Sequence, residues 1–218
     1  MMPQYHNKVM KVIFRIYLDC NITTFPIDCT SILNHYNFIV RTYGELEKQN
    51  KRLYEMCLLY SSDAFRYNNL IAYNEKIKTP ERIRFSLMHE LAHIMLGHTE
   101  ERRENEDEAN YFASNILAPR SVIFRYGCKN CREIHDIFNM SYAASQRAFD
   151  DYISWKCYKI SDVDKEIGDY FFNRRNQVKN ATKDINESAF KSKTPLWDEW
   201  YEDISTYAPH LLIPALLR

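Results

Sequence analysis

The pentapeptide HELAH at residues 89–93 most constrains what this chain can fold into, because it has the pattern H-E-x-x-H. On an α-helix, His89 and His93 project from the same face one turn apart, where both imidazoles can bind one metal ion. Glu90 lies about 100° around the helix, within reach of a water molecule held by that metal. The segment therefore predicts a helix that carries a zinc-dependent hydrolytic site.

A packed helix with two hydrogen-bonded histidines is the alternative interpretation. Ile83, Leu87, Leu91 and Met95 form an apolar row with a spacing of four, which any core helix shows. That row explains the helix but not the histidines. With 7 His in 218 residues, a chance match to the pattern is expected only about 2 times in 100.

The composition is that of a folded domain without an overall electrostatic field. The chain has 218 residues, of which 45% are hydrophobic and 14% aromatic, which is enough for a substantial core. Lysine plus arginine equals aspartate plus glutamate, at 29 each, so no net charge attracts the molecule to nucleic acid or to an anionic membrane. We expect partners to be recognised locally, and we do not expect direct nucleic-acid binding.

The sequence predicts neither export nor a membrane span. The apolar stretch at residues 12–18 is interrupted by Arg15 and has no basic region or cleavage site beside it. No run approaches the roughly 18 apolar residues that a transmembrane helix needs. Six cysteines are too few and too scattered for a disulfide framework. We therefore expect a cytoplasmic protein with reduced thiols.

The region before the motif predicts a helix at residues 5–19 and a short helix that begins at Pro26 and ends near Tyr36. Strands are expected at 37–41, 53–60 and 69–74, with turn residues at 61–64. These strands would form a small antiparallel sheet directly before the motif helix.

The motif helix is expected to begin at Thr79 and Pro80 and to stop at Gly97, and a second helix should follow from about residue 100 to 117. Residues 132–138 and 142–155 then predict a helix-turn-helix pair, with Ser141 as the cap of its second helix. Such a pair can bind DNA or pack, and the neutral charge favours packing. Residues 161–190 read as a charged helix, and 194–218 as a return strand or an interaction segment.

Together these elements predict an α+β fold that is mostly helical. We expect a zincin-like metallopeptidase domain at residues 1–125, with the small sheet before the H-E-x-x-H helix. A helix-turn-helix-like segment at 126–160 would pack on it. A helical extension and tail of unknown role would follow at 161–218.

A catalytic zinc ion keeps three protein ligands and one open position, so a third ligand is required. His98 follows His93 by five residues where the extended three-histidine motif needs six, and Gly97 ends the helix before it. A carboxylate from the next helix is the better candidate. Glu108 adjoins the apolar segment 109–113 and is preferred, and Glu104, one turn earlier on the same face, is the alternative.

Cys128 and Cys131, with His135 four residues on, raise the question of a second zinc site. Only three ligands are local, and Cys157 would have to supply the fourth without a matching pair. We expect one metal ion per chain, which is zinc or another divalent metal.

Two consecutive segments resemble the ImmA/IrrE family of metallopeptidases. They are RFSLMHELAHIMLGH at residues 84–98 and EDEANYFASNILAP at 106–119. FPID at 25–28, LIAYN at 70–74 and FNMSYAASQR at 138–147 are also similar to the family's patterns. The resemblance covers roughly residues 20–155, and its two central motifs are specific in combination.

The resemblance implies that His89 and His93 are metal ligands, that Glu90 is the catalytic acid and base, and that Glu108 is the third ligand. It further implies a protease that cuts one protein, a helix-turn-helix repressor of a mobile element or stress regulon, and so acts in transcription regulation as an anti-repressor. The competing hypothesis is a non-proteolytic binding or sensing module with a structural metal that contacts a repressor or DNA. An intact Glu90 favours the protease, because a structural site has no use for a general base.

Two details of substrate handling can also be predicted. The strand at 69–74 could hold an extended substrate by edge pairing. Tyr111 and His98 are candidates, by proximity in sequence, for stabilising the transition-state oxyanion.

Overall fold

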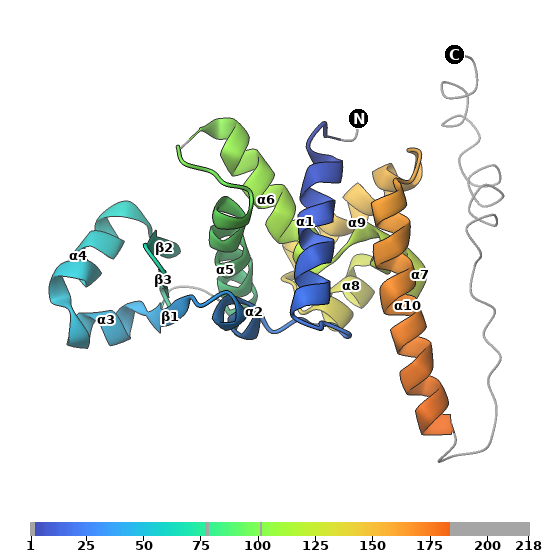
Figure 1. Cartoon of the computed structure of the whole chain (residues 1–218), viewed down its shortest axis with the longest axis horizontal. Helices are drawn as coiled ribbons and strands as arrows, with labels where there is room; N and C mark the ends of the chain where they lie inside the picture. The colour runs from blue at the N-terminus through green and yellow to red at the C-terminus, as the bar shows by residue number, and fades with distance from the viewer. Residues whose placement is uncertain (1–2, 77–78, 101, 184–218) are drawn as a thin grey trace.

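The computed structural model describes residues 3–76, 79–100 and 102–183. Its elements in chain order are α1 (His6–Asp19), α2 (Cys29–His35), β1 (Ile39–Thr42), α3 (Tyr43–Gln49), α4 (Lys51–Tyr60), β2 (Ala64–Tyr67), β3 (Leu70–Tyr73), α5 (Pro80–Met95), α6 (Arg103–Leu117), α7 (Arg120–Tyr126), α8 (Cys131–Phe138), α9 (Tyr142–Lys156) and α10 (Asp162–Lys183). Figure 1 shows the sheet with α3 and α4 at one end, α5 and α6 in the middle, and α1 with α7–α10 at the other end. The predicted α+β, mostly helical fold is confirmed.

The sheet has three strands in the order β1-β3-β2. β2 and β3 are antiparallel, with Ala64 opposite Tyr73, whereas β1 and β3 are parallel, with Ile39 opposite Leu70. The expectation of a purely antiparallel sheet is therefore wrong. Parallel neighbours need a long crossover connection, and α3 and α4 lie in that connection.

The strand predicted at residues 53–60 is instead helix α4. The side chain of Asn50 caps this helix by accepting a hydrogen bond from the backbone N–H of Leu53 at 3.1 Å, and Cys57 is buried on its inner face. The local run of tyrosine, cysteine and leucine has strand propensity, but the cap and the packing decide otherwise. The sheet gains β2 from a segment for which no strand was predicted and of which only Ala64 belonged to the expected turn.

Two other helix boundaries differ from the prediction. α2 begins at Cys29 and not at Pro26, because the side chain of Asp28 accepts hydrogen bonds from the backbone N–H groups of Thr30 and Ser31 at 3.0 and 3.1 Å. α7, which was not predicted, follows Pro119 directly.

Helix α3 was not predicted, whereas α1, α5, α6, α8, α9 and α10 lie close to their predicted positions. α1, α5 and α6 match the expected segments, and α8 and α9 form the expected pair, with Ser141 capping α9 through the backbone N–H of Ala144. α10 covers the first part of the predicted helical stretch 161–190. The predicted return strand or interaction segment at 194–218 lies outside the described residues.

One hydrophobic core joins α1, α2 and the helices from α5 to α10. At its centre Tyr17, Phe25, Phe138 and Phe171 contact one another, with the ring centroids of Phe25 and Phe171 4.6 Å apart. The core thus takes side chains from each of the three segments into which the sequence was divided. A smaller cluster under α3 and α4, centred on Tyr43 and Cys57, supports the sheet end.

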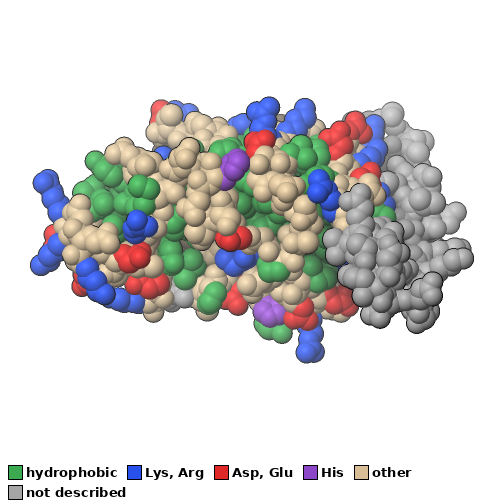
Figure 2. Space-filling view, turned by 60° about the horizontal axis from the view of Figure 1, so that its bottom comes forward, with side chains coloured by type: hydrophobic (Ala, Val, Ile, Leu, Met, Phe, Trp, Pro, Cys, Tyr) green, Lys and Arg blue, Asp and Glu red, His purple; other side chains and the backbone are tan. Residues whose placement is uncertain are grey.

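The surface is of mixed charge. On the face drawn in Figure 2, acidic and basic side chains are interspersed and neither sign dominates. Among the described helices, none has both the length and the apolar character needed to cross a membrane.

Candidate active site

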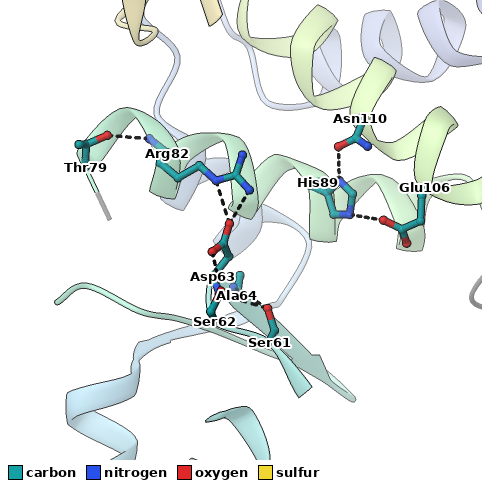
Figure 3. Close-up of polar contacts among 9 residues, drawn as sticks. All are labelled: Ser61, Ser62, Asp63, Ala64, Thr79, Arg82, His89, Glu106 and Asn110. Atoms are coloured by element: carbon teal, nitrogen blue, oxygen red, sulfur yellow. Dashed lines mark hydrogen bonds and ion pairs between the residues drawn. The ribbon is translucent and has the colours of Figure 1, made fainter. Parts of the chain in front are cut away.

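Side chains in the first turns of helix α5 form hydrogen bonds both to the sheet end of the molecule and to the opposite, helical end. The Thr79 hydroxyl caps it by accepting the backbone N–H of Arg82 at 3.4 Å, and Pro80 follows in the first turn. The Arg82 side chain donates through Nε to Asp63, just before β2, at 2.8 Å (Figure 3). Arg84 donates to the carbonyl oxygens of Ile27 at 2.7 Å and Phe138 at 3.3 Å. The histidines of this helix are therefore carried on a rigid element.

The structure brings His89, His93 and Glu106 together. The Nε2 atoms of the two histidines are 3.0 Å apart, and the Glu106 carboxylate lies 3.3 Å from each of them, one oxygen toward each ring. Figure 3 shows Glu106 on α6 reaching across to His89 on α5. A tetrahedral zinc site with bonds of about 2.0–2.1 Å separates its ligand atoms by about 3.3 Å. The donor set and its spacing therefore fit a divalent metal of the zinc type.

Glu106 occupies the position beside the two histidines that was predicted for Glu108. On α6, Glu106 lies three residues before Ala109 and seven before Ala113, so it shares the buried face that packs against α5. Glu108 is about 200° further round the helix and contacts Lys8 of α1 at 3.0 Å. Glu104, the alternative, is exposed. The preference for Glu108 followed closeness along the chain, but spacing to buried residues does not separate the two acids, and only the rotation of α6 against α5 brings Glu106 to the histidines.

The outer nitrogens of both histidines also have partners. Nδ1 of His89 lies 3.1 Å from the side-chain oxygen of Asn110, which is one turn after Glu106 (Figure 3). Nδ1 of His93 lies 3.1 Å from Nδ1 of His98. Such outer partners orient metal-binding imidazoles and select their tautomer. Asn110 was not among the predicted site residues, although its spacing of four from Glu106 places both on one helix face.

Burial shifts the pKa values of the histidine and glutamate side chains in the site. It lowers the pKa of His89 and lowers that of His93 to about 4, so that both rings are neutral at neutral pH, as metal ligation requires. Burial also raises the pKa of Glu90 to about 7; the positive charge of Arg66 opposes this rise and the negative charge of Glu106 adds to it. A carboxyl group with such a pKa can both accept and release a proton near neutral pH.

A cleft of about 420 Å³ opens onto this group. Its walls come from β2, α5 and the chain after α5, and they include Phe65, Arg66, His89, Glu90, His93 and Glu106. β2 is an edge strand, whereas β3 is the central strand and pairs on both sides. The strand at 69–74 is β3, so the expectation that it pairs with a substrate is wrong, because both of its edges are occupied.

Neither candidate oxyanion stabiliser is placed for that role. The Tyr111 hydroxyl lies 2.6 Å from Nδ1 of His6, on the far side of α6, and both ring nitrogens of His98 face protein partners. The cationic side chain in the wall of the cleft is Arg66. No sequence signal identified it, because it belongs to a strand that was not predicted.

A larger cavity of about 560 Å³ lies between α5, α6 and α9, with Leu117 and Met140 among its lining residues. A pocket of about 260 Å³ shares Phe85 and Asn110 with this cavity and shares His89 with the cleft. The hollowed surface therefore continues from the histidines toward the helix pair α8–α9.

The cysteine pair of the sequence does not meet His135 in a ligand cluster. Within the described residues, the group of histidine, cysteine and acidic side chains with metal-ligand spacing is His89, His93 and Glu106. Cys128 is buried, and Nδ1 of His135 lies 2.5 Å from the carbonyl oxygen of Met140.

Next to this cleft, helix α5 presents two histidines toward an acidic side chain of the following helix, α6. Residues 48–146 match the family model of the IrrE N-terminal-like domain, Peptidase_M78, which indicates a metallopeptidase-type domain. The match confirms the resemblance to the ImmA/IrrE metallopeptidases. No curated protein and no solved structure gives a significant match.

Proposed function

We propose that the protein is a metal-dependent endopeptidase in which His89, His93 and Glu106 hold the metal and Glu90 is the catalytic acid and base. One observation carries this proposal. The two Nε2 atoms and the Glu106 carboxylate converge within 4.8 Å of one another in a cleft whose wall also holds Glu90. Two imidazoles and one carboxylate form the His₂Glu donor set of catalytic zinc sites, which favours zinc.

In this proposal, each residue of the site has a separate role in peptide hydrolysis. A metal bound there supplies Lewis acidity toward the scissile carbonyl and makes the attacking water more acidic. The Glu90 carboxylate takes the proton of that water and later delivers it to the nitrogen of the leaving amine. Arg66 faces the cleft as the side chain that can stabilise the developing oxyanion. No covalent intermediate is needed.

The substrate would be a protein segment in extended form. β2 lines the cleft and is an edge strand, so a substrate strand can pair with it while its side chains reach the cleft. The connected pocket and cavity beyond Phe85 offer room for residues on one side of the scissile bond.

A helix-turn-helix repressor of a mobile element or stress regulon is the substrate that the family resemblance favours, and a cytoplasmic site of action agrees with such a target. In this proposal α8 and α9 serve as packing helices of the protease rather than as a DNA reader. Ile134 and Phe138 of α8 and Trp155 of α9 belong to the hydrophobic core that these helices share with the rest of the domain.

The test is a cleavage assay with purified components. The full chain, analysed for bound metal, is incubated with a repressor encoded beside its gene, and the products are identified by mass spectrometry. We expect metal-dependent cleavage at one bond that Glu90→Gln abolishes while metal is retained. If Glu90→Gln cuts at the wild-type rate, the assigned role is wrong. DNA binding by the chain that is indifferent to Glu90, without cleavage, would support the binding-module hypothesis instead.

A further inference from the structure

His98 and Glu108 lie directly behind the metal-binding face of His93. His98 is almost fully buried, with 5% of its side chain exposed, and its two ring nitrogens face in opposite directions. Nδ1 lies 3.1 Å from Nδ1 of His93, and Nε2 lies 3.4 Å from the Glu108 carboxylate. The same carboxylate oxygen accepts a hydrogen bond from the Lys8 ammonium at 3.0 Å. The four side chains thus form a row that ends at the Nδ1 atom of His93.

The end of α5 explains why His98 reaches this position. Gly97 has a left-handed backbone with φ of +73°, and the N–H groups of Gly97 and His98 donate to the carbonyl oxygens of Ile94 and His93 at 3.1 and 2.8 Å. This is the Schellman pattern. It brings the side chain of the second residue after the C-cap into contact with the side chain of the third residue before the C-cap. Here those two residues are His98 and His93. The contact is usually apolar, and in this chain it joins two imidazoles.

The direction of each hydrogen bond follows from the outermost partner. The Glu108 oxygen that accepts from the Lys8 ammonium is an acceptor toward His98 as well, so Nε2 of His98 must carry its proton toward Glu108. In a neutral imidazole Nδ1 of His98 is then the acceptor, and Nδ1 of His93 must donate to it. Nε2 of His93 is consequently left with its lone pair pointing at His89 and Glu106.

We propose that His98 and Glu108 are positioning residues that fix the ring orientation and the tautomer of His93 for metal binding. The inference rests on the proposed metal site. It gives Glu108, the acid of the E-A-N segment, a role behind the ligand rather than on the metal. Asn110 is the equivalent partner of His89, since its amide oxygen accepts from Nδ1 of that ring.

The experiment measures the affinity of the purified full chain for Zn²⁺ by competition with a chromophoric chelator, and follows Co²⁺ absorption as a probe of ligand geometry. His98→Phe keeps the ring volume and removes both hydrogen bonds, so we expect Zn²⁺ affinity to fall roughly 10–100-fold. His98→Asn places an amide oxygen where Nδ1 now lies, and this acceptor-only atom should restore affinity to within about 3-fold of the wild type. A purely structural role of the ring would not be rescued by a shorter side chain.

Glu108→Gln, alone and combined with His98→Phe, tests whether Glu108 acts on His93 through His98. Since Glu108 acts through His98, we expect Glu108→Gln alone to weaken Zn²⁺ binding about 3–10-fold and to have no further effect when combined with His98→Phe. Glu104→Gln, an exposed acid of the same helix, is the matched control and should bind as the wild type does. Additive effects of the two substitutions would overturn the proposed series.

His89→Ala separates failure of this inference from failure of the proposed function. If His89→Ala loses Zn²⁺ binding while His98→Phe binds as tightly as the wild type with an unchanged Co²⁺ spectrum, the metal site stands and the positioning role is wrong. If His89→Ala also binds as the wild type does, the metal site itself is misassigned. Circular dichroism of each metal-free variant shows whether the fold is retained.

Discussion

Two clusters of histidine and carboxylate within the described part of the chain have the same kinds of side chain but different roles. In the first, His6 is buried between the Tyr111 hydroxyl at 2.6 Å and Asp164 at 2.8 Å, and its exposed fraction is 3%. Asp164 also accepts from Trp155 and Ser161. Each ring nitrogen of His6 therefore has a protein partner, and the cluster ties α1 to α6 and α10.

In the second cluster, the inner nitrogens of His89 and His93 face each other and the Glu106 carboxylate. Their outer nitrogens have partners in Asn110 and His98. With the tautomers derived above, the two Nε2 atoms and the Glu106 carboxylate are acceptors that face one another, an arrangement that a bound cation would stabilise. The two clusters therefore differ less in their residue types than in whether the side chains that meet include hydrogen-bond donors.

The largest expected effect separates chemistry from binding within the second cluster. Glu90→Gln should lower the rate of substrate cleavage by about 1000-fold, since general acid and base catalysis contributes roughly 10²–10⁴-fold. Metal content, measured by atomic emission on the purified protein, should stay at the wild-type level, because Glu90 is not a proposed ligand. Loss of the metal from this variant would place Glu90 among the ligands.

Glu106→Gln should weaken Zn²⁺ binding more than any substitution behind the histidines, by more than about 100-fold, because it removes a charged ligand rather than an outer partner. Competition with a chelator measures the dissociation constant. Glu104→Gln is the control on the same helix. If Glu108→Gln has the larger effect of the two, the third ligand is Glu108 after all and the side chains of α6 rearrange on metal binding.

The same kind of substitution in the first cluster should act on stability alone. His6→Ala leaves Asp164 buried without its imidazole partner, so we expect the free energy of unfolding to fall by about 2–3 kcal/mol. Urea denaturation of the metal-free protein measures this loss. The variant should bind Zn²⁺ with the wild-type dissociation constant under conditions where it is folded, and a large change in metal affinity would contradict the separation of the two clusters.

The smallest effect concerns the turn that places His98. Gly97 has a positive φ, which a residue with a Cβ atom adopts with strain, and no atom lies within 4 Å of that position. Gly97→Ala should therefore cost about 1 kcal/mol of stability through backbone conformation alone. Thermal unfolding of the metal-free variant is the measurement, and an unchanged midpoint would show that the turn has an alternative geometry.

The difference between α5 and α6 shows how far the sequence could lead. In α5 the cap at Thr79, the apolar row and the histidine spacing all lie within one helix, so its bounds and its functional face were predictable. In α6 the acids at 104, 106 and 108 look alike in sequence, and the choice among them depends on the rotation of that helix against α5. Likewise α4 has local strand propensity, but the Asn50 cap and the burial of Cys57 make it a helix.

The sequence by itself determined that His89, Glu90 and His93 share one helix, that a second helix with acids follows, and that the chain resembles the ImmA/IrrE metallopeptidases. These properties depend on helical periodicity and on motifs, which are local. The tertiary structure decided that Glu106 meets the histidines, that β2 rather than β3 borders the cleft, and that Glu108 reaches His93 only through His98. Those relations join residues on different elements, and only the packing of α5, α6 and the sheet sets the distances between them.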